Sequence, residues 1–240
     1  LTGMDGYAGG YGGDYMTPEQ EIPDAVEQGI DWETCMTMNG RWGYNMVDKN
    51  FKSTTDLLQK LSDIASKSGN FLLNVGPKAD GTFPDESIQR LEEVGDWMDV
   101  NGEAIHGTVG SPFQELDWGR ATQKFHDEST TLYLQVFDWP ADGELLVPGL
   151  AGTVTSARVL GGSDVLYEMG QGAVTLHLPS LQPNKHIGVV AVEVQGKPVV
   201  YESPEITISA DTFVHTLKVT LSVGSEDLDI RYSTNGNTQL

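Results

Sequence analysis

The residues of this chain that could carry out chemistry are carboxylates near its start, followed by a short aromatic segment. Seven carboxylates lie between positions 14 and 33: Asp14, Glu19, Glu21, Asp24, Glu27, Asp31 and Glu33. Two carboxyl groups about 5–5.5 Å apart can cleave a glycosidic bond, one as the nucleophile and the other as the proton donor. The donor must keep its proton near neutral pH, which burial or a second carboxylate can arrange. On composition alone, most of these side chains are expected to be solvated loop charges.

The aromatic segment comes directly after the carboxylates. Trp42, Tyr44 and Asn45 lie in an expected loop that follows an expected strand, and Trp32 opens that strand. An aromatic face can cover the apolar face of a sugar ring, while an asparagine supplies a directional hydrogen bond. The alternative is that Trp42 fills a hydrophobic gap at the rim of a core.

Two strand–loop–helix units are expected to position these residues. Residues 32–38 and 71–75 have the pattern of short buried strands, and residues 53–69 and 85–99 have helical periodicity. The apolar face expected for the second helix is formed by Ile88, Leu91, Gly95 and Met98, with Trp97 beside it. Strands that alternate with helices predict parallel pairing with the helices outside. A complete eight-fold barrel needs about 250 residues, so we expect a partial (β/α) barrel over residues 1–108.

The pattern changes after about residue 110. Short β-rich runs separated by turns occur at 131–137, 145–147, 154–160, 173–178 and 188–194. This spacing predicts an all-β sandwich. The expected fold class is therefore α/β plus all-β. A truncated (β/α) barrel is followed by a C-terminal antiparallel β-sandwich over 109–198 and a partial β module over 199–240.

Five stretches, in order along the chain, resemble landmarks of the family 29 glycoside hydrolases, the α-L-fucosidases. They are Gly-Asp-Tyr-Met-Thr-Pro-Glu-Gln-Glu-Ile-Pro (13–23), Trp-Glu-Thr-Cys-Met-Thr-Met-Asn (32–39), Trp-Gly-Tyr-Asn (42–45), Phe-Leu-Leu-Asn-Val-Gly-Pro-Lys-Ala-Asp-Gly-Thr-Phe-Pro (71–84) and Val-Asn-Gly-Glu-Ala-Ile-His (100–106). The resemblance implies a catalytic barrel followed by a β-sandwich.

The resemblance also implies roles for single residues. Glu19, in Thr-Pro-Glu-Gln, matches the position of the acid/base, and Glu33, in the Trp-Glu pair, is the alternative. Trp42 corresponds to an aromatic residue that lines the sugar pocket, and Tyr44, Asn45 and Trp32 complete the expected substrate-binding set. The family's nucleophile is an aspartate on an earlier barrel strand. No position here matches that motif, and Asp5 in Met-Asp-Gly is a weak candidate.

These features predict an exo-acting glycoside hydrolase for terminal fucose or a galacto-configured sugar. L-Fucose is 6-deoxy-L-galactose, so a galactosidase with a rebuilt pocket, including a β-D-galactosidase, is the alternative enzyme. A non-catalytic carbohydrate-binding remnant is the alternative outside the enzymes. Turnover abolished by Glu19→Gln supports an enzyme, and sugar binding without turnover supports the remnant.

Charge and composition limit the partners. The chain has 14 Lys and Arg against 35 Asp and Glu, a net charge of −21, which disfavours nucleic acid and anionic membranes. The histidines have no metal-ligand spacing, so neither a metal nor a cofactor is expected. The start lacks a signal-peptide pattern. The bacterial-type resemblance is compatible with a secreted or periplasmic parent enzyme.

A partial barrel also predicts self-association. Two strand–helix units cannot close a barrel, and parallel strands normally have both sheet faces covered. We therefore expect a homo-oligomer in which neighbouring subunits cover the open half, with the Tyr/Gly-rich segment 1–16 at or near the interface.

Overall fold

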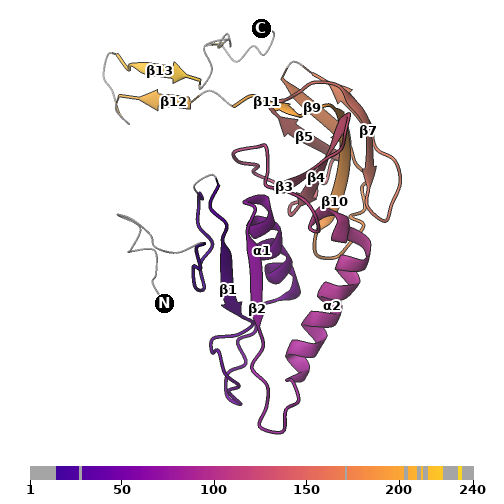
Figure 1. Ribbon diagram of the computed structural model, residues 1–240. Coiled ribbons are helices and arrows are strands. Elements are labelled where there is room, and N and C mark those ends of the chain that lie inside the picture. The colour runs from indigo at the N-terminus through magenta and orange to yellow at the C-terminus, as the bar shows by residue number, and fades with distance from the viewer. Residues whose placement is uncertain are drawn as a thin grey trace.

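The fold is mostly β, with two α-helices among the residues that the structure describes. The computed structural model describes residues 15–26, 29–170, 172–202, 205–209, 212, 216–223 and 232–233. Two strands and the two helices form one end of the molecule, and antiparallel sheets form the other (Figure 1). Asp5 and most of segment 1–16 lie outside the described residues.

The first strand–helix–strand unit forms as its sequence predicts. Strands β1 (Glu33–Thr37) and β2 (Asn70–Asn74) pair in parallel, with Glu33 opposite Asn70 and Thr37 opposite Asn74. Helix α1 (Thr54–Ser66) connects them. Its Ser53 cap accepts a hydrogen bond from the backbone N–H of Asp56, which satisfies a free donor of the first turn.

The β1–β2 pair has one covered face and one open face, because side chains alternate along a strand. Thr34 and Met36 lie on the covered face and are buried. The open face carries Glu33, Cys35 and Thr37 opposite Asn70, Leu72 and Asn74. Leu72, in the middle of β2, is 49% exposed there. A large apolar side chain at the centre of a parallel pair is therefore left in contact with solvent.

The segment before β1 is more regular than the sequence predicts. Its carboxylates are expected to be solvated loop charges, but Met16 and Glu19 make parallel bridges with Trp32 and Cys35. The hydrogen bonds run from Met16 N to Asp31 O (3.0 Å) and from Gln20 N to Cys35 O (2.8 Å). A third parallel segment therefore lies beside β1, on the edge that β2 does not occupy. The segment is polar and lacks the apolar periodicity by which a strand is recognised in a sequence.

The β-rich half is built from two main antiparallel sheets. One has the order β3-β4-β10-β7 and the other the order β5-β9-β8. The strands of the first are β3 (Gly119–Phe125), β4 (Ser129–Val136), β10 (Gly188–Gln195) and β7 (Val154–Val159). Those of the second are β5 (Glu144–Pro148), β9 (Ala173–His177) and β8 (Leu166–Met169). Two short pairs complete the set, β6 (Leu150–Ala151) with β11 (Val199–Val200) and β12 (Glu205–Ile208) with β13 (Val219–Ser222).

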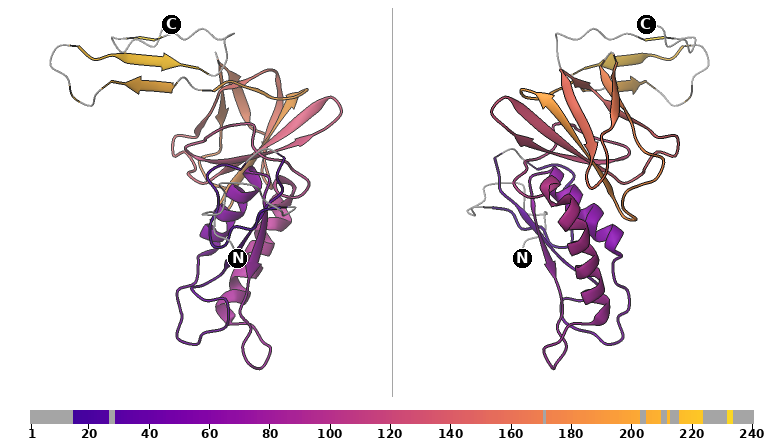
Figure 2. Two further views of the ribbon diagram at one scale, coloured as in Figure 1. Left: turned by 60° about the vertical axis from the view of Figure 1, so that its left-hand side comes forward. Right: turned by 90° about the vertical axis from the view of Figure 1, so that its right-hand side faces the viewer.

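The four-stranded sheet is covered on both faces. Leu132 and Leu134 of β4 belong to the core that this sheet shares with the three-stranded sheet. Tyr133, between them, belongs to a second core that includes side chains of the helices α1 and α2. Figure 2 shows the two helices next to the β-rich half of the molecule. Trp97 lies at the centre of that second core, is 0% exposed and donates its Nε1–H to Ile187 O (3.0 Å). The sandwich thus covers the helices and leaves the open face of the β1–β2 pair uncovered.

Helix α2 (Asp85–Asn101) forms where the sequence predicts it, but of its expected apolar side chains only Met98 packs against the core. Ile88 and Leu91 are exposed, whereas Ser87, Trp97 and Asn101 are buried. The four-stranded sheet decides the orientation, because it offers a partner for the large Trp97 ring and its N–H. In the described part of the chain, no helix combines the length and apolarity that crossing a membrane requires.

A polar cluster joins both helices to the sandwich and predicts how stability depends on pH. His186 Nδ1 lies 2.7 Å from Thr55 Oγ1, and its side chain is 11% exposed. Burial and then the nearby Lys185 lower the pKa of His186 below its ordinary 6.5, although Glu93 opposes them. Glu93 itself accepts hydrogen bonds from Thr54 and Lys185, which lower its pKa to about 2.

We expect stability to fall as the pH drops below 6.5, because the unfolded chain then binds a proton at His186 that the folded chain resists. The contribution of Glu93 is lost only at pH values below its ordinary 4.5, so the two windows are separate. Urea unfolding at pH 7 and pH 5 checks this. His186→Gln should reduce the difference in unfolding free energy between the two pH values, and an unchanged difference would contradict the assignment.

Candidate active site

The structure brings Glu19 and Trp42 into direct contact. Trp42 Nε1 donates to Glu19 Oε1 at 2.9 Å. Glu19 is placed by the parallel bridge to Cys35, and the chain turns directly after it at Gln20, whose φ is 59°. Trp42 lies in the loop after β1 and is 39% exposed. A carboxylate and an exposed aromatic ring therefore meet on the open side of the parallel strands.

Buried and half-buried polar residues hold the Trp42 loop in place. Asn74, the last residue of β2, donates from Nδ2 to Trp42 O (2.8 Å) and to Thr37 Oγ1 (3.2 Å). Thr37 Oγ1 lies 3.0 Å from Arg41 O, and Lys52 Nζ donates to Thr37 O (2.8 Å). The ends of β1 and β2 thus fix the backbone on both sides of Trp42. Asn74 lies in the stretch 71–84, one of the five that resemble family landmarks, but the sequence assigned it no role.

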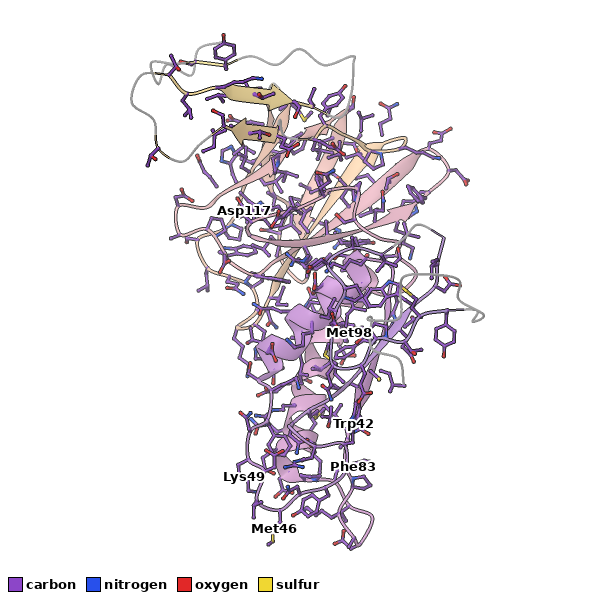
Figure 3. The ribbon with its side chains drawn as sticks, turned by 90° about the vertical axis from the view of Figure 1, so that its left-hand side faces the viewer. Trp42, Met46, Lys49, Phe83, Met98 and Asp117 are labelled. Carbon is purple, nitrogen blue, oxygen red and sulfur yellow. The ribbon has the colours of Figure 1, made fainter. Side chains whose placement is uncertain are left out.

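Tyr44 and Asn45 open onto a separate pocket. It has a volume of about 230 Å³ and lies between the loops after β1 and β2. Its lining residues are Tyr44, Asn45, Asp48, Lys49, Phe51, Lys78, Pro84, Asp85 and Glu86. Figure 3 shows Trp42, Phe83, Lys49 and Met46 at this same end of the molecule. Glu19 and Trp42 do not line the pocket, so the expected site residues fall into two neighbouring groups.

Gly76 allows the two loops to approach each other. A Cβ at this position would lie 2.6 Å from Tyr44 N and 2.7 Å from the carbonyl carbon of Gly43. Both atoms belong to backbone and cannot move aside alone. The sequence signal is Val75-Gly76-Pro77, which directly follows the last residue of β2.

Trp32 is a core residue, which corrects the expectation that it binds substrate. It is 1% exposed, its Nε1 donates to Lys67 O (2.9 Å), and its ring packs against Gly69. The odd–even alternation of β1 explains this, since Trp32 shares the covered face with Thr34 and Met36. No ring face is left for a sugar.

Glu33 lies on the open face but at the amino end of β1. Glu19 is bridged to Cys35, two residues further along the strand, which corresponds to about 7 Å. Bridged residues and residues two apart share a face, so the Glu19 and Glu33 side chains leave the sheet on the same side. In (β/α) barrels the reactive groups gather at the carboxyl ends of the parallel strands, and Glu19 is bridged nearer to that end of β1 than Glu33 lies. The other candidate, Asp5, lies outside the described residues.

The exposed position of Trp42 gives a prediction that separates binding from folding. Trp42→Ala removes an aromatic face and one hydrogen bond, so we expect weaker binding of a sugar ligand. The free energy of unfolding should change by about 1 kcal/mol or less. Titration with the sugar and urea unfolding measure the two quantities. A collapse of stability with normal binding by the remaining folded molecules would make Trp42 a core residue.

Comparisons with known proteins agree on one family. Residues 3–103 match the family model described as α-L-fucosidase. The α-L-fucosidase of Dictyostelium discoideum is 31% identical over 172 residues, which cover 66% of this chain and 36% of that protein. The α-L-fucosidase of Branchiostoma floridae is 28% identical over 180 residues, 72% of this chain and 40% of that protein.

Solved structures give the same result. α-L-Fucosidase isoenzyme 1 from Paenibacillus thiaminolyticus superposes with a TM-score of 0.70 and 32% identity, covering 78% of this chain and 46% of that one. A GH29 α-L-fucosidase from Bacteroides thetaiotaomicron superposes with a TM-score of 0.66 and 28% identity, covering 75% and 43%. The chain thus spans less than half the length of each of these relatives. Together, these matches identify the chain as a fucosidase-like segment of glycoside hydrolase family 29.

Proposed function

We propose that this chain supplies the proton donor and the sugar-stacking wall of an exo-acting, α-L-fucosidase-like glycoside hydrolase. The observation that carries the proposal is the 2.9 Å contact between Trp42 Nε1 and Glu19 Oε1 on the open side of parallel strands. The relatives named above are α-L-fucosidases, which favours fucose over the galactosidase alternative.

In this proposal, Glu19 donates a proton to the glycosidic oxygen as the bond to the sugar breaks. Trp42 holds Oε1, which leaves Oε2 to carry the proton, while the exposed ring of Trp42 covers the apolar face of the sugar. The resulting carboxylate then removes a proton from the attacking water. The Bacteroides relative was trapped as a covalent intermediate with 2-fluoro-fucosyl fluoride in a Glu-to-Gln variant, which supports a retaining course for the present chain.

The nucleophile is proposed to come from outside the described residues of one chain. Glu33 is two residues from the bridge partner of Glu19 and at the amino end of its strand, a poor position for attack. A second subunit can supply a carboxylate across the open face. Asp5 remains a candidate from the chain's own N-terminal segment.

The domain organisation that goes with this function has three parts. Residues 1–108 form part of a (β/α) barrel, residues 109–198 a β-sandwich, and residues 199–240 a fragment of a further β module. The parallel β1–β2 pair with α1 as its crossover supports the first part. The two antiparallel sheets around one core support the second.

We also propose a homo-oligomer that covers the open face of the β1–β2 pair. Leu72 is exposed there, and the sandwich packs on the other side of the helices. An exposed apolar strand centre and unpaired strand edges favour association. Light scattering in dilute native buffer should give a multiple of the chain mass of 26.1 kDa. A stable, active monomer would contradict the proposal.

A panel of nitrophenyl glycosides tests the function directly. We expect turnover of the α-L-fucoside and little turnover of the β-D-galactoside. Turnover of the galactoside alone would replace fucosidase by galactosidase. Binding of fucose without turnover of any substrate would favour the carbohydrate-binding remnant instead.

A further inference from the structure

A second cleft lies on the β-sandwich, away from the candidate active site. Its volume is about 560 Å³, within the usual range for ligand sites. It is lined by Pro112, Phe113, Gln114, Glu115, Asp117, Trp118, Leu146, Pro148, Val200, Tyr201 and Glu202. Figure 3 shows Asp117 on the sandwich and Trp42 near the other end of the molecule. A ligand in this cleft therefore does not occupy the site at Glu19.

The walls of the cleft are fixed by backbone hydrogen bonds. Trp118 O accepts from Phe137 N (2.9 Å) and Asp138 N (3.2 Å), and Trp118 Nε1 donates to Leu146 O (2.8 Å) on the edge strand β5. Tyr201, which also lines the cleft, donates its backbone N–H to Gly149 O (2.9 Å). The Trp118 ring and the Tyr201 backbone are thus held before any ligand arrives, which lowers the entropic cost of binding.

The lining selects a neutral ligand with both hydroxyl groups and an apolar face. The described residues that line the cleft include three carboxylates, Glu115, Asp117 and Glu202, and no Lys, Arg or His. A phosphate, sulfate or uronic acid would therefore face three carboxylates with no cationic side chain among these residues to offset them. Carboxylates accept hydrogen bonds from hydroxyl groups, and one oxygen of Glu202 already accepts from Gln114 Nε2 (2.6 Å). The half-buried Trp118 and the 43% exposed Tyr201 contribute aromatic rings to the lining.

We propose that this cleft is a secondary carbohydrate-binding site for a neutral oligosaccharide. The choice of sugar rests on the proposed fucosidase-like function. The volume of the cleft is large enough for more than one sugar ring. Because the cleft lies away from the candidate active site, it could anchor a large glycan whose end is being cleaved there. Such a second contact raises the effective concentration of the reacting end without changing the chemical step.

Indole N–H signals in ¹⁵N NMR spectra test the proposal, because the five tryptophans report on different places. Trp118 reports on the cleft, Trp42 on the candidate active site, and the buried Trp97 on folding. The probe is 2′-fucosyllactose, a neutral trisaccharide, added to Glu19→Gln protein so that it stays intact. We expect the Trp118 signal to shift with saturation. Tyr201→Ala should weaken this binding about tenfold or more, and Tyr201→Phe should retain it.

Trp139→Ala is the matched control. Trp139 also packs partly buried against the sandwich core and donates its Nε1–H to a backbone carbonyl, Pro179 O (2.9 Å), but it does not line the cleft. Its loss should leave binding at Trp118 unchanged. The proposal is overturned if the Trp118 signal does not shift with the trisaccharide, or if it shifts equally in Tyr201→Ala. It is also overturned if the signal shifts only with spermidine, a polycation that would bind the three carboxylates of the lining by charge alone. A shift of the Trp42 signal alone would support the proposed function and reject the second site. A shift of the Trp118 signal alone would support the second site and count against sugar binding at Trp42.

Discussion

Glu19→Gln is expected to lower kcat about 10²–10⁴-fold on a fucoside with a poor leaving group, since a positioned proton donor contributes about that much. The amide keeps the shape of the side chain and can still accept the hydrogen bond from Trp42, but it cannot donate the proton to the leaving oxygen. A fucoside with an activated nitrophenol leaving group needs less protonation. Its bond-cleavage step should therefore slow much less. The ratio of the two losses, measured by steady-state and single-turnover kinetics, identifies the acid.

Glu21→Gln is the matched control for this experiment. Glu21 belongs to the same segment and is exposed, and it is its backbone carbonyl, not its carboxylate, that accepts from Thr34 Oγ1 (2.6 Å). Its substitution should leave kcat within a factor of about two. If Glu19→Gln also stays within that factor on both substrates, the acid role passes to Glu33.

Trp97→Ala is expected to lower the free energy of unfolding by about 3–5 kcal/mol. Trp97 is 0% exposed and fills the core between helix α2 and the four-stranded sheet, so alanine leaves a large cavity there. The change also leaves Ile187 O without the indole donor. Equilibrium unfolding in urea, followed by circular dichroism, measures the loss.

Two variants separate the contributions at this position. Trp97→Phe keeps much of the volume but removes the N–H, and should cost about 1–3 kcal/mol through the unpaired carbonyl. Trp42→Ala removes the same side-chain type from an exposed loop and should cost far less. If Trp97→Ala is no more destabilising than Trp42→Ala, the helices and the sandwich do not depend on each other for stability.

Much of the fold could be predicted from local patterns. The Ser53 cap, the stripe of α1 and the apolar run of β2 are strong signals over short distances, and each element forms within a few residues of its expected position. The features that could not be predicted depend on contacts between residues far apart in the sequence. The orientation of α2 depends on Trp97 reaching Ile187, and the segment at Glu19 depends on pairing with β1. Neither partner can be identified from periodicity within the element itself.

The candidate site follows the same division. Glu19 and Trp42 were each selected by motif, but their mutual hydrogen bond could not be predicted from their separation in sequence. Trp32 was misassigned because a tryptophan at a strand start has the same composition signal whichever face it occupies. Asn74 was missed because its role is to bind the backbone of Trp42, far away in sequence. Local composition says which residues can do chemistry, and the strand register decides which of them meet.

The hydrogen bond from Trp97 to Ile187 has a consequence for synthesis of the chain. Its two residues are 90 positions apart. At about 5–20 residues per second, roughly 5–20 s pass between their additions to the growing polypeptide. During that interval the ring of Trp97 and the inner side of α2 lack the sheet that buries them. The nascent chain therefore leaves Trp97, a side chain that is fully buried after folding, without its sheet partner until β10 emerges from the ribosome, and a chaperone can bind this surface during that period.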